Sequence, residues 1–164
     1  MKRALGVDPG VRNLGFAVVE EDGPSISLLE VGLLRGEGEP FPAFLARTRA
    51  LVISLGERWS PDLVCVESLL YGRNASSAAL VWQVRGVVLL ASFEIGCELV
   101  ELSPKQVKSA VCAHGNSSKE EVRRGVSLIL GLGEERLPRS PDALDAVAVA
   151  VGGLALHRLK GVVG

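Results

Sequence analysis

The sequence predicts an α/β protein built on one mixed β-sheet with helices packed on its faces. Three strand-like segments follow one another within residues 3–34 and are joined by short turns, which is the pattern of an antiparallel meander. Two later apolar segments, residues 63–66 and 97–102, alternate with long segments of helical periodicity. After residue 102 only helix signals occur, so the expected order is β-β-β-α-β-α-β-α-α-α.

The first three strands are expected at residues 3–8, 14–20 and 25–34. Apolar residues, many of them β-branched, dominate these segments, as is usual in strands. The first strand ends at Pro9-Gly10 and the second ends just before Asp22-Gly23, and both pairs are typical of turns. The connections are short, so neighbouring strands should pair antiparallel.

The middle of the chain is expected to alternate between helices and buried strands. Residues 43–59 place apolar side chains at helical spacing. The continuous apolar run of residues 63–66 is typical of a central parallel strand, and Glu67 ends it. Asn74 is a suitable N-cap for a helix to residue 95 that is apolar nearly all round. Such a helix should be buried on every side, against the sheet on one face and a second copy of the chain on the other.

The three helices expected after residue 102 each have a start signal. The first and last begin with serine followed by proline, which combines an N-cap with proline at the first helical position. They should span residues 104–112 and 141–160. Between them, Ser117 and Glu120 form a capping-box pattern for a helix to residue 130. Gly161 is expected to cap the end of the last helix.

Composition argues for a single globular domain over residues 1–164. The hydrophobic fraction is 48% and the charged fraction 23%, which is typical of a folded chain. A net charge of −1 excludes a protein that is basic overall, although a basic face can lie beside an acidic pocket. The three cysteines lack metal-ligand spacing and suit reduced thiols. Because no apolar run reaches the ~20 residues that span a bilayer and no signal peptide is evident, we expect a cytoplasmic protein without a membrane partner.

Four acidic residues are placed where they can converge. Asp8 and Glu67 each end an apolar strand, and the two side chains emerge at one sheet edge if these strands are parallel neighbours. Asp142 and Asp145 share one face of the first turn of the last helix. Converging carboxylates repel one another unless a cation lies between them, and hard oxygen ligands suit Mg²⁺ or Mn²⁺. Two such ions, about 4 Å apart, can hydrolyse a phosphodiester.

Each acid also has a structural explanation when it is taken alone. Asp8 before Pro9-Gly10 fits a turn, and Asp142 and Asp145 fit the acidic start of a helix. Glu67 is harder to explain in this way, because a charge after a buried strand needs a partner. The combination of the four favours a metal site.

Basic residues cluster in the third quarter of the chain. Lys105 and Lys108 share a helical face, as do Lys119 and Arg123, and Arg73 lies in the loop after Glu67. These side chains fit an ordinary solvated surface or, beside a phosphodiester-cleaving site, contacts to DNA phosphates. His114 is expected in a surface loop, with proton transfer as the alternative role.

Four motifs together resemble the RuvC family of Holliday-junction resolvases. They are residues 6–10 (Gly-Val-Asp-Pro-Gly), Val66-Glu67 with Asn74 seven residues after the glutamate, residues 105–108 (Lys-Gln-Val-Lys), and residues 142–148 (Asp-Ala-Leu-Asp-Ala-Val-Ala). The resemblance covers essentially the whole chain. It implies an RNase H-like fold, with a mixed five-stranded sheet and helices on both faces, and a homodimer.

The resemblance also implies an activity. A RuvC-like enzyme makes paired symmetric nicks in four-way junction DNA during homologous recombination and DNA repair. Two Mg²⁺ or Mn²⁺ ions per active site support the hydrolysis, and the ends carry 5′-phosphate and 3′-hydroxyl groups. The implied partners are the junction DNA and the RuvA–RuvB branch-migration complex.

Residue roles follow from the same resemblance. The family's acidic catalytic positions match Asp8, Glu67, Asp142 and Asp145. Its basic DNA-contacting region matches Lys105, Lys108 and Lys119. Family members often carry phenylalanine three residues after the glutamate as a wedge between junction bases, whereas this chain has Leu70 followed by Tyr71. Either apolar side chain can act as the wedge.

Three other functions stay open on the residues alone. A nucleotide-binding lobe of kinase or chaperone type also begins with a strand, an aspartate and a glycine turn, but it needs a second lobe for which 164 residues leave no room. An RNase H-like nuclease acting on RNA–DNA hybrids would use the same chemistry. A non-catalytic junction-binding protein of this fold would not need all four acids.

Overall fold

The computed structural model describes residues 1–68 and 75–162. Three predicted DNA contacts, Leu70, Tyr71 and Arg73, and the predicted N-cap Asn74 lie outside the described residues. The described elements are β1 (Lys2–Pro9), β2 (Asn13–Asp22), β3 (Ser25–Arg35), α1 (Phe41–Trp59), β4 (Leu63–Glu67), α2 (Ala75–Glu94), β5 (Glu98–Leu102), α3 (Pro104–Cys112), α4 (Lys119–Leu130), the short 3₁₀ helix η1 (Glu134–Arg136) and α5 (Pro141–Val162).

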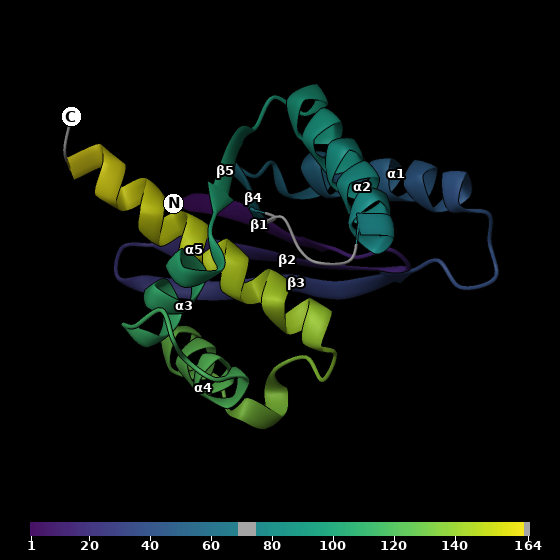
Figure 1. Ribbon diagram of the computed structural model, residues 1–164. Coiled ribbons are helices and arrows are strands. Elements are labelled where there is room, and N and C mark those ends of the chain that lie inside the picture. The colour runs from purple at the N-terminus through teal and green to yellow at the C-terminus, as the bar shows by residue number, and fades with distance from the viewer. Residues whose placement is uncertain (69–74, 163–164) are drawn as a thin grey trace.

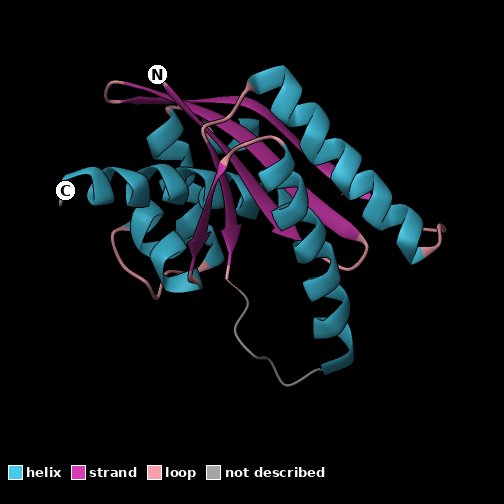
Figure 2. Cartoon of the chain, turned by 90° about the horizontal axis from the view of Figure 1, so that it is seen from above, coloured by secondary structure: helices cyan, strands magenta, loops and turns pink. Residues whose placement is uncertain are grey.

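The strands form one mixed sheet in the order β3-β2-β1-β4-β5. β1, β2 and β3 pair antiparallel, while β1 with β4 and β4 with β5 pair parallel. The helices form a layer on each face of the sheet (Figures 1 and 2), with α1 and α2 on one side and α3, α4 and α5 on the other. The predicted five-stranded α/β architecture is therefore confirmed.

The register of the two central strands decides where the strand-end acids point. Val7 on β1 is paired with Val66 on β4, and both are buried against α1 and α2. Side chains alternate between the faces of a strand, so the next residues, Asp8 and Glu67, emerge on the opposite face, where α5 packs. The strands that carry Asp8 and Glu67 are therefore parallel neighbours, as the predicted convergence of the two acids requires.

Two glycines let α5 approach the sheet closely. A Cβ atom on Gly15 would overlap the carbonyl oxygen of Asp142, and one on Gly6 would overlap that of Ala146. Gly15 is also the direct sheet partner of Asp8. These glycines place the first turns of α5, with their two acids, directly over the end of β1.

The predicted capping box before α4 is wrong by one residue. The Ser118 hydroxyl accepts a hydrogen bond from the Glu121 amide at 3.2 Å, and the Glu121 carboxylate accepts one from the Ser118 amide at 2.7 Å. Ser117 is instead buried and donates its hydroxyl to the His114 carbonyl oxygen at 2.9 Å. The sequence offers two serines and two glutamates in a row, and the burial of Ser117 selects the second pair.

Gly161 does not cap the last helix as predicted, because α5 continues to Val162. A glycine costs about 1 kcal/mol inside a helix, which one position near the end of a long helix tolerates.

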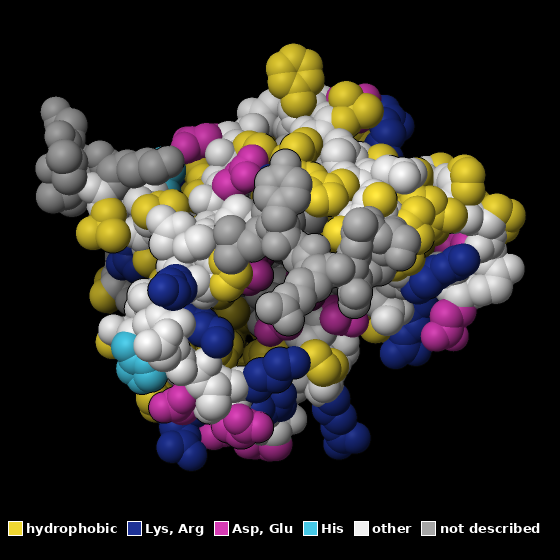
Figure 3. Space-filling model, in the orientation of Figure 1, with side chains coloured by type: hydrophobic (Ala, Val, Ile, Leu, Met, Phe, Trp, Pro, Cys, Tyr) yellow, Lys and Arg dark blue, Asp and Glu magenta, His cyan; other side chains and the backbone are white. Residues whose placement is uncertain are grey.

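One face of α2 is exposed in the single chain, so its predicted burial against a second copy stays a prediction. Phe93 is 82% exposed and Leu90 53% exposed, and both lie on α2. Figure 3 shows hydrophobic side chains gathered over this part of the surface. Arg85, on the same helix, is buried and pairs with Glu101 on β5 at 2.5 Å, so it has a structural role. None of the helices in the described ranges is long and apolar enough to cross a membrane.

Candidate active site

The structure brings together the four predicted acids at one edge of the sheet. Asp8 and Glu67 come from the ends of β1 and β4, and Asp142 and Asp145 from the first two turns of α5. Burial, together with the negative charges of Asp145, Asp142 and Glu67, raises the pKa of Asp8 from 3.8 to about 7. Each of the other three acids therefore lies near enough to oppose the ionisation of Asp8.

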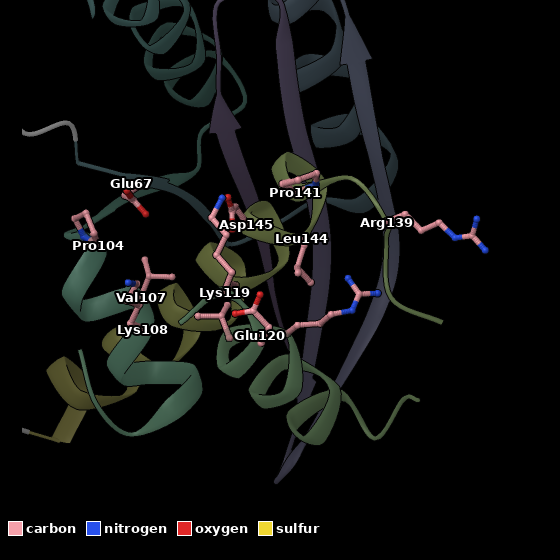
Figure 4. Close-up of a pocket in the computed structure, with 13 residues that line it drawn as sticks. Glu67, Pro104, Val107, Lys108, Lys119, Glu120, Arg139, Pro141, Leu144 and Asp145 are labelled. Carbon is pink, nitrogen blue, oxygen red and sulfur yellow. The ribbon is translucent and has the colours of Figure 1, made fainter. Parts of the chain in front are cut away.

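Two lysines partly offset the acidic charge. Burial and the charge of Asp145 raise the pKa of Glu67, while Lys108 acts to lower it. Desolvation and the charge of Asp142 raise the pKa of Asp145, while Lys119 acts to lower it. Lys119 extends from α4 toward Asp145 (Figure 4). The site therefore pairs an excess of carboxylates with cations from two other helices.

Two of the acids and both lysines line a cavity of about 350 Å³ beside the sheet edge (Figure 4). Asp8 and Asp142 are not in its lining. The charged groups of its wall belong to Glu67, Lys108, Lys119, Glu120, Arg123, Arg139 and Asp145. Apolar side chains fill much of the remaining wall, for example Leu144. A cavity that combines charged groups of both signs with an apolar wall suits the binding of a charged substrate group.

Local sequence fixes the helices that present the lysines. Ser103 caps α3 by accepting a hydrogen bond from the Gln106 amide at 3.3 Å, and the Gln106 side chain accepts one from the Ser103 amide at 2.8 Å. Lys108 follows in the second turn of this helix. Lys119 is the first residue of α4, directly after the capping serine. The predicted N-cap of α3 is confirmed.

The residues predicted to contact DNA differ in whether they line the cavity. Lys108 and Lys119 line the cavity, whereas Lys105 is exposed and is not in its lining. Arg123 lines the cavity with a guanidinium that is bonded to backbone carbonyl groups. No structural observation bears on Leu70, Tyr71 or Arg73, whose DNA contacts stay predictions.

Sequence reasoning missed three residues that belong to the site. Glu120 on α4 lines the cavity, whereas the sequence indicated only a capping role for it. Arg139 lines the cavity and extends away from Glu67 on its far side (Figure 4). Its position next to the Ser140-Pro141 helix start was the available signal. Gly15 permits the contact between β2 and α5, and a glycine within an apolar strand was its signal.

The four acids differ from a preformed metal site in their spacing but match one in their chemistry. Among the residues that the structure describes, no three histidine, cysteine or acidic side chains are grouped closely enough to hold one ion. The four acids nevertheless offer only carboxylate oxygens, which Mg²⁺ and Mn²⁺ prefer. A divalent cation would also offset the repulsion that raises the pKa of Asp8. The donors therefore fit such ions, and binding requires the carboxylates to move closer together.

His114 has contacts that suit the predicted loop role. Its Nδ1 atom lies 3.1 Å from the Ser117 hydroxyl oxygen, and its Nε2 atom lies 3.8 Å from the Glu121 carboxylate. The imidazole is exposed and is not in the cavity lining. It ties the connection between α3 and α4 to the start of α4.

Comparison with known proteins gives a consistent family. Residues 4–153 match the family model described as crossover junction endodeoxyribonuclease RuvC. The enzyme of that name from Chloroflexus aggregans is 41% identical over 150 residues, which cover 91% of this chain and 90% of the relative. The one from Rubrobacter xylanophilus is 35% identical over 161 residues, which cover 98% of this chain and 89% of the relative.

Solved structures agree with the sequence matches. The structure of T. thermophilus RuvC in complex with Holliday junction substrate superposes with a TM-score of 0.91 at 33% identity, covering 98% of this chain and 97% of that one. The yeast mitochondrial Holliday junction resolvase Ydc2 shares the fold, with a TM-score of 0.68 at 19% identity. The fold is RNase H-like, as the resemblance implied. The chain is a member of the RuvC family of crossover junction endodeoxyribonucleases.

Proposed function

We propose that this protein resolves Holliday junctions by cutting two opposed strands of four-way junction DNA. The observation that carries the proposal is the group of four acids at one sheet edge, beside a cavity that also presents Lys108 and Lys119. Family membership and the similarity to a RuvC structure in complex with a Holliday junction support it. The proposed cuts are symmetric and leave 5′-phosphate and 3′-hydroxyl ends.

The chain's own groups have defined parts in this reaction. Asp8, Glu67, Asp142 and Asp145 are the residues that would hold two Mg²⁺ or Mn²⁺ ions. When bound, such ions lower the pKa of water and stabilise the leaving oxygen of a phosphodiester. Lys108 and Lys119 offer cations to the phosphate and offset the charge of Glu67 and Asp145. The buried surroundings of Asp8 strengthen these electrostatic interactions.

The biological setting follows from the same proposal. The protein would act in homologous recombination and DNA repair, in the cytoplasm, together with the RuvA–RuvB branch-migration complex. Two symmetric cuts need two active sites, which a homodimer supplies. Lys105, Lys108 and Lys119 would contact DNA phosphates, and Leu70 or Tyr71 would enter the junction.

A substrate comparison tests the proposed function. We expect the purified protein with Mg²⁺ or Mn²⁺ to nick a four-way junction at paired positions that DNA ligase can seal. Linear duplex DNA and an RNA–DNA hybrid of the same sequence should be cut at least tenfold more slowly. Preferential cutting of the hybrid would instead favour the RNase H-like alternative, and junction binding without cutting in either metal would favour the non-catalytic one.

If the exposed apolar face of α2 forms the dimer interface, a charge placed on it should prevent dimer formation. Replacing Phe93, which is 82% exposed, with Glu should give monomers, because a charge in an apolar interface loses its hydration without gaining a partner. Light scattering should show the halved mass, and junction binding should weaken. Leu128→Glu is the matched control, since Leu128 is 76% exposed on α4, and it should leave the mass unchanged. An unchanged mass for the Phe93 variant would contradict the α2 interface.

The repulsion around Asp8 predicts how metal and pH affect stability. Without metal, the folded protein holds the Asp8 proton up to about pH 7, whereas its ordinary pKa is 3.8. The unfolded state therefore binds fewer protons between these values, so stability falls as pH rises through this range. Asp8→Asn should remove that loss and raise metal-free stability at pH 8 by roughly 1–3 kcal/mol.

Thermal unfolding with and without Mg²⁺ measures both effects. Millimolar Mg²⁺ should stabilise the folded wild-type protein by about 1 kcal/mol through binding. This stabilisation should raise its melting temperature by several degrees. It should raise that of Asp8→Asn much less. Equal Mg²⁺ stabilisation of the two proteins would contradict a metal site at Asp8.

A further inference from the structure

Arg123 is bonded to the protein backbone in a way that the neighbouring basic residues are not. Its Nη1 donates to the carbonyl oxygen of Pro138 at 3.0 Å, and its Nη2 donates to those of Glu134 at 2.7 Å and Leu137 at 3.4 Å. Its Nε lies 4.0 Å from the Glu134 carboxylate. The side chain is 27% exposed. A planar guanidinium that uses its donors in this way has few left for a DNA phosphate.

The segment that Arg123 holds leads directly into the acidic helix. Residues 134–138 connect α4 to α5, and Leu137 within them is 3% exposed. Four residues after Leu137 the chain begins α5, whose first two turns carry Asp142 and Asp145. Arg123 therefore connects α4, which begins with Lys119, to the segment that precedes α5, which carries two of the acids.

We propose that Arg123 is a positioning residue, and not the DNA contact that sequence spacing indicated. It fixes the 134–138 segment against α4, and so sets where the first turn of α5 presents its carboxylates and where Arg139 stands at the cavity rim. This inference rests on the proposed nuclease function. Gly6 and Gly15 allow α5 to pack closely on the sheet, and Arg123 holds in place the segment that precedes the first turn of α5.

Arg124 provides a matched comparison. It is the next residue on α4, and its Nε lies 3.9 Å from the carboxylate of the same Glu134. It is 74% exposed, and in the described part of the chain it has no bond to a backbone carbonyl like those of Arg123. The two arginines share the charge and the ion-pair partner. Arg123 alone of the two has the backbone hydrogen bonds that the proposal requires, so Arg124 controls for the loss of charge.

The test compares Arg123→Ala, Arg123→Lys and Arg124→Ala in the dimeric protein. Junction affinity and its salt dependence are measured in EDTA, and single-turnover cleavage is measured at saturating junction over a range of Mg²⁺ concentrations. Arg123→Ala should cut about 10- to 100-fold more slowly, because small displacements of catalytic groups have effects of this size. It should also need more Mg²⁺ for half-maximal rate, while its affinity stays within about twofold. Arg123→Lys should recover part of the rate, since one ammonium reaches fewer carbonyls than a guanidinium does.

Trypsin digestion gives a readout that does not depend on activity. Arg136 and Arg139 lie in or next to the held segment, so Arg123→Ala should be cut there faster than the wild type and than Arg124→Ala, while its melting temperature shows that the remaining fold persists. Arg124→Ala should match the wild type in rate, affinity and digestion.

Two results would overturn the proposal. The first is weaker junction binding by Arg123→Ala with a salt slope smaller by about one, restored by Arg123→Lys, which is the signature of a phosphate contact. The second is an Arg123→Ala variant that cuts like Arg124→Ala. In both cases the wild type would still cut junctions, whereas failure of the proposed function would leave the wild type inactive as well.

Discussion

Asp8→Asn should reduce junction cleavage by about 10³-fold or more, an effect expected when a group central to charge stabilisation is removed. Asp8 is the acid whose ionisation all three of the others oppose, so it lies at the centre of the group. Asparagine keeps the shape of the side chain but removes the charge that would hold a cation. Junction binding in EDTA should change less than about threefold, because phosphate affinity comes from basic residues.

Single-turnover cleavage in Mg²⁺ and in Mn²⁺, with a gel-shift assay in EDTA, measures both parts of this result. Asp22→Asn is the control, since Asp22 is an exposed acid at the far end of β2, and it should cut like the wild type. Wild-type rates for Asp8→Asn in Mg²⁺ would remove Asp8 from the catalytic group. A parallel loss in the control would point to a general effect of acid removal.

Gly15→Ala should impair both stability and cleavage. The added Cβ would overlap the backbone of Asp142, which cannot move without shifting the start of α5. Overpacking of this kind costs about 3 kcal/mol, and occasionally more. Because the shift would carry Asp142 away from Asp8, cleavage at a temperature where the variant is folded should fall by at least about tenfold. Urea unfolding and single-turnover cleavage measure the two effects.

Gly152→Ala is the matched control for this substitution. Gly152 lies in α5, and its added Cβ would meet Cδ2 of Leu102, the end of a flexible side chain, at 3.1 Å. We expect a change in stability of no more than about 1 kcal/mol, because the tight contact is offset by the helix preference of alanine. Equal effects of the two substitutions would show that contact with the Asp142 backbone is not what makes Gly15 necessary.

Local patterns were sufficient to predict the sheet and most helix starts. The apolar segments and turn pairs of β1–β3, the continuous apolar run of β4 and the serine–proline pairs before α3 and α5 each reflect a constraint within a few residues. Errors arose where the deciding contact lies elsewhere. Burial of Ser117, for example, selects the register of the capping box.

The acids could be predicted because their positions follow from element type: strand ends for Asp8 and Glu67, and one helical turn for Asp142 and Asp145. The surroundings of Arg123 could not be predicted in this way. Its bonding partners are backbone carbonyls 11 to 15 residues away, and main-chain carbonyls carry no sequence signal. Gly15 is intermediate, since its residue type suggested a close approach but not the identity of the neighbour.

The central claim is that Asp8, Glu67, Asp142 and Asp145 form one metal-binding centre. Anomalous diffraction from crystals soaked in Mn²⁺ tests it most directly. We predict manganese peaks bounded by these four carboxylates, two per active site at about 4 Å separation, with the side chains drawn closer together. Manganese bound elsewhere, or no peak at this sheet edge at a concentration that supports cleavage, would contradict the account.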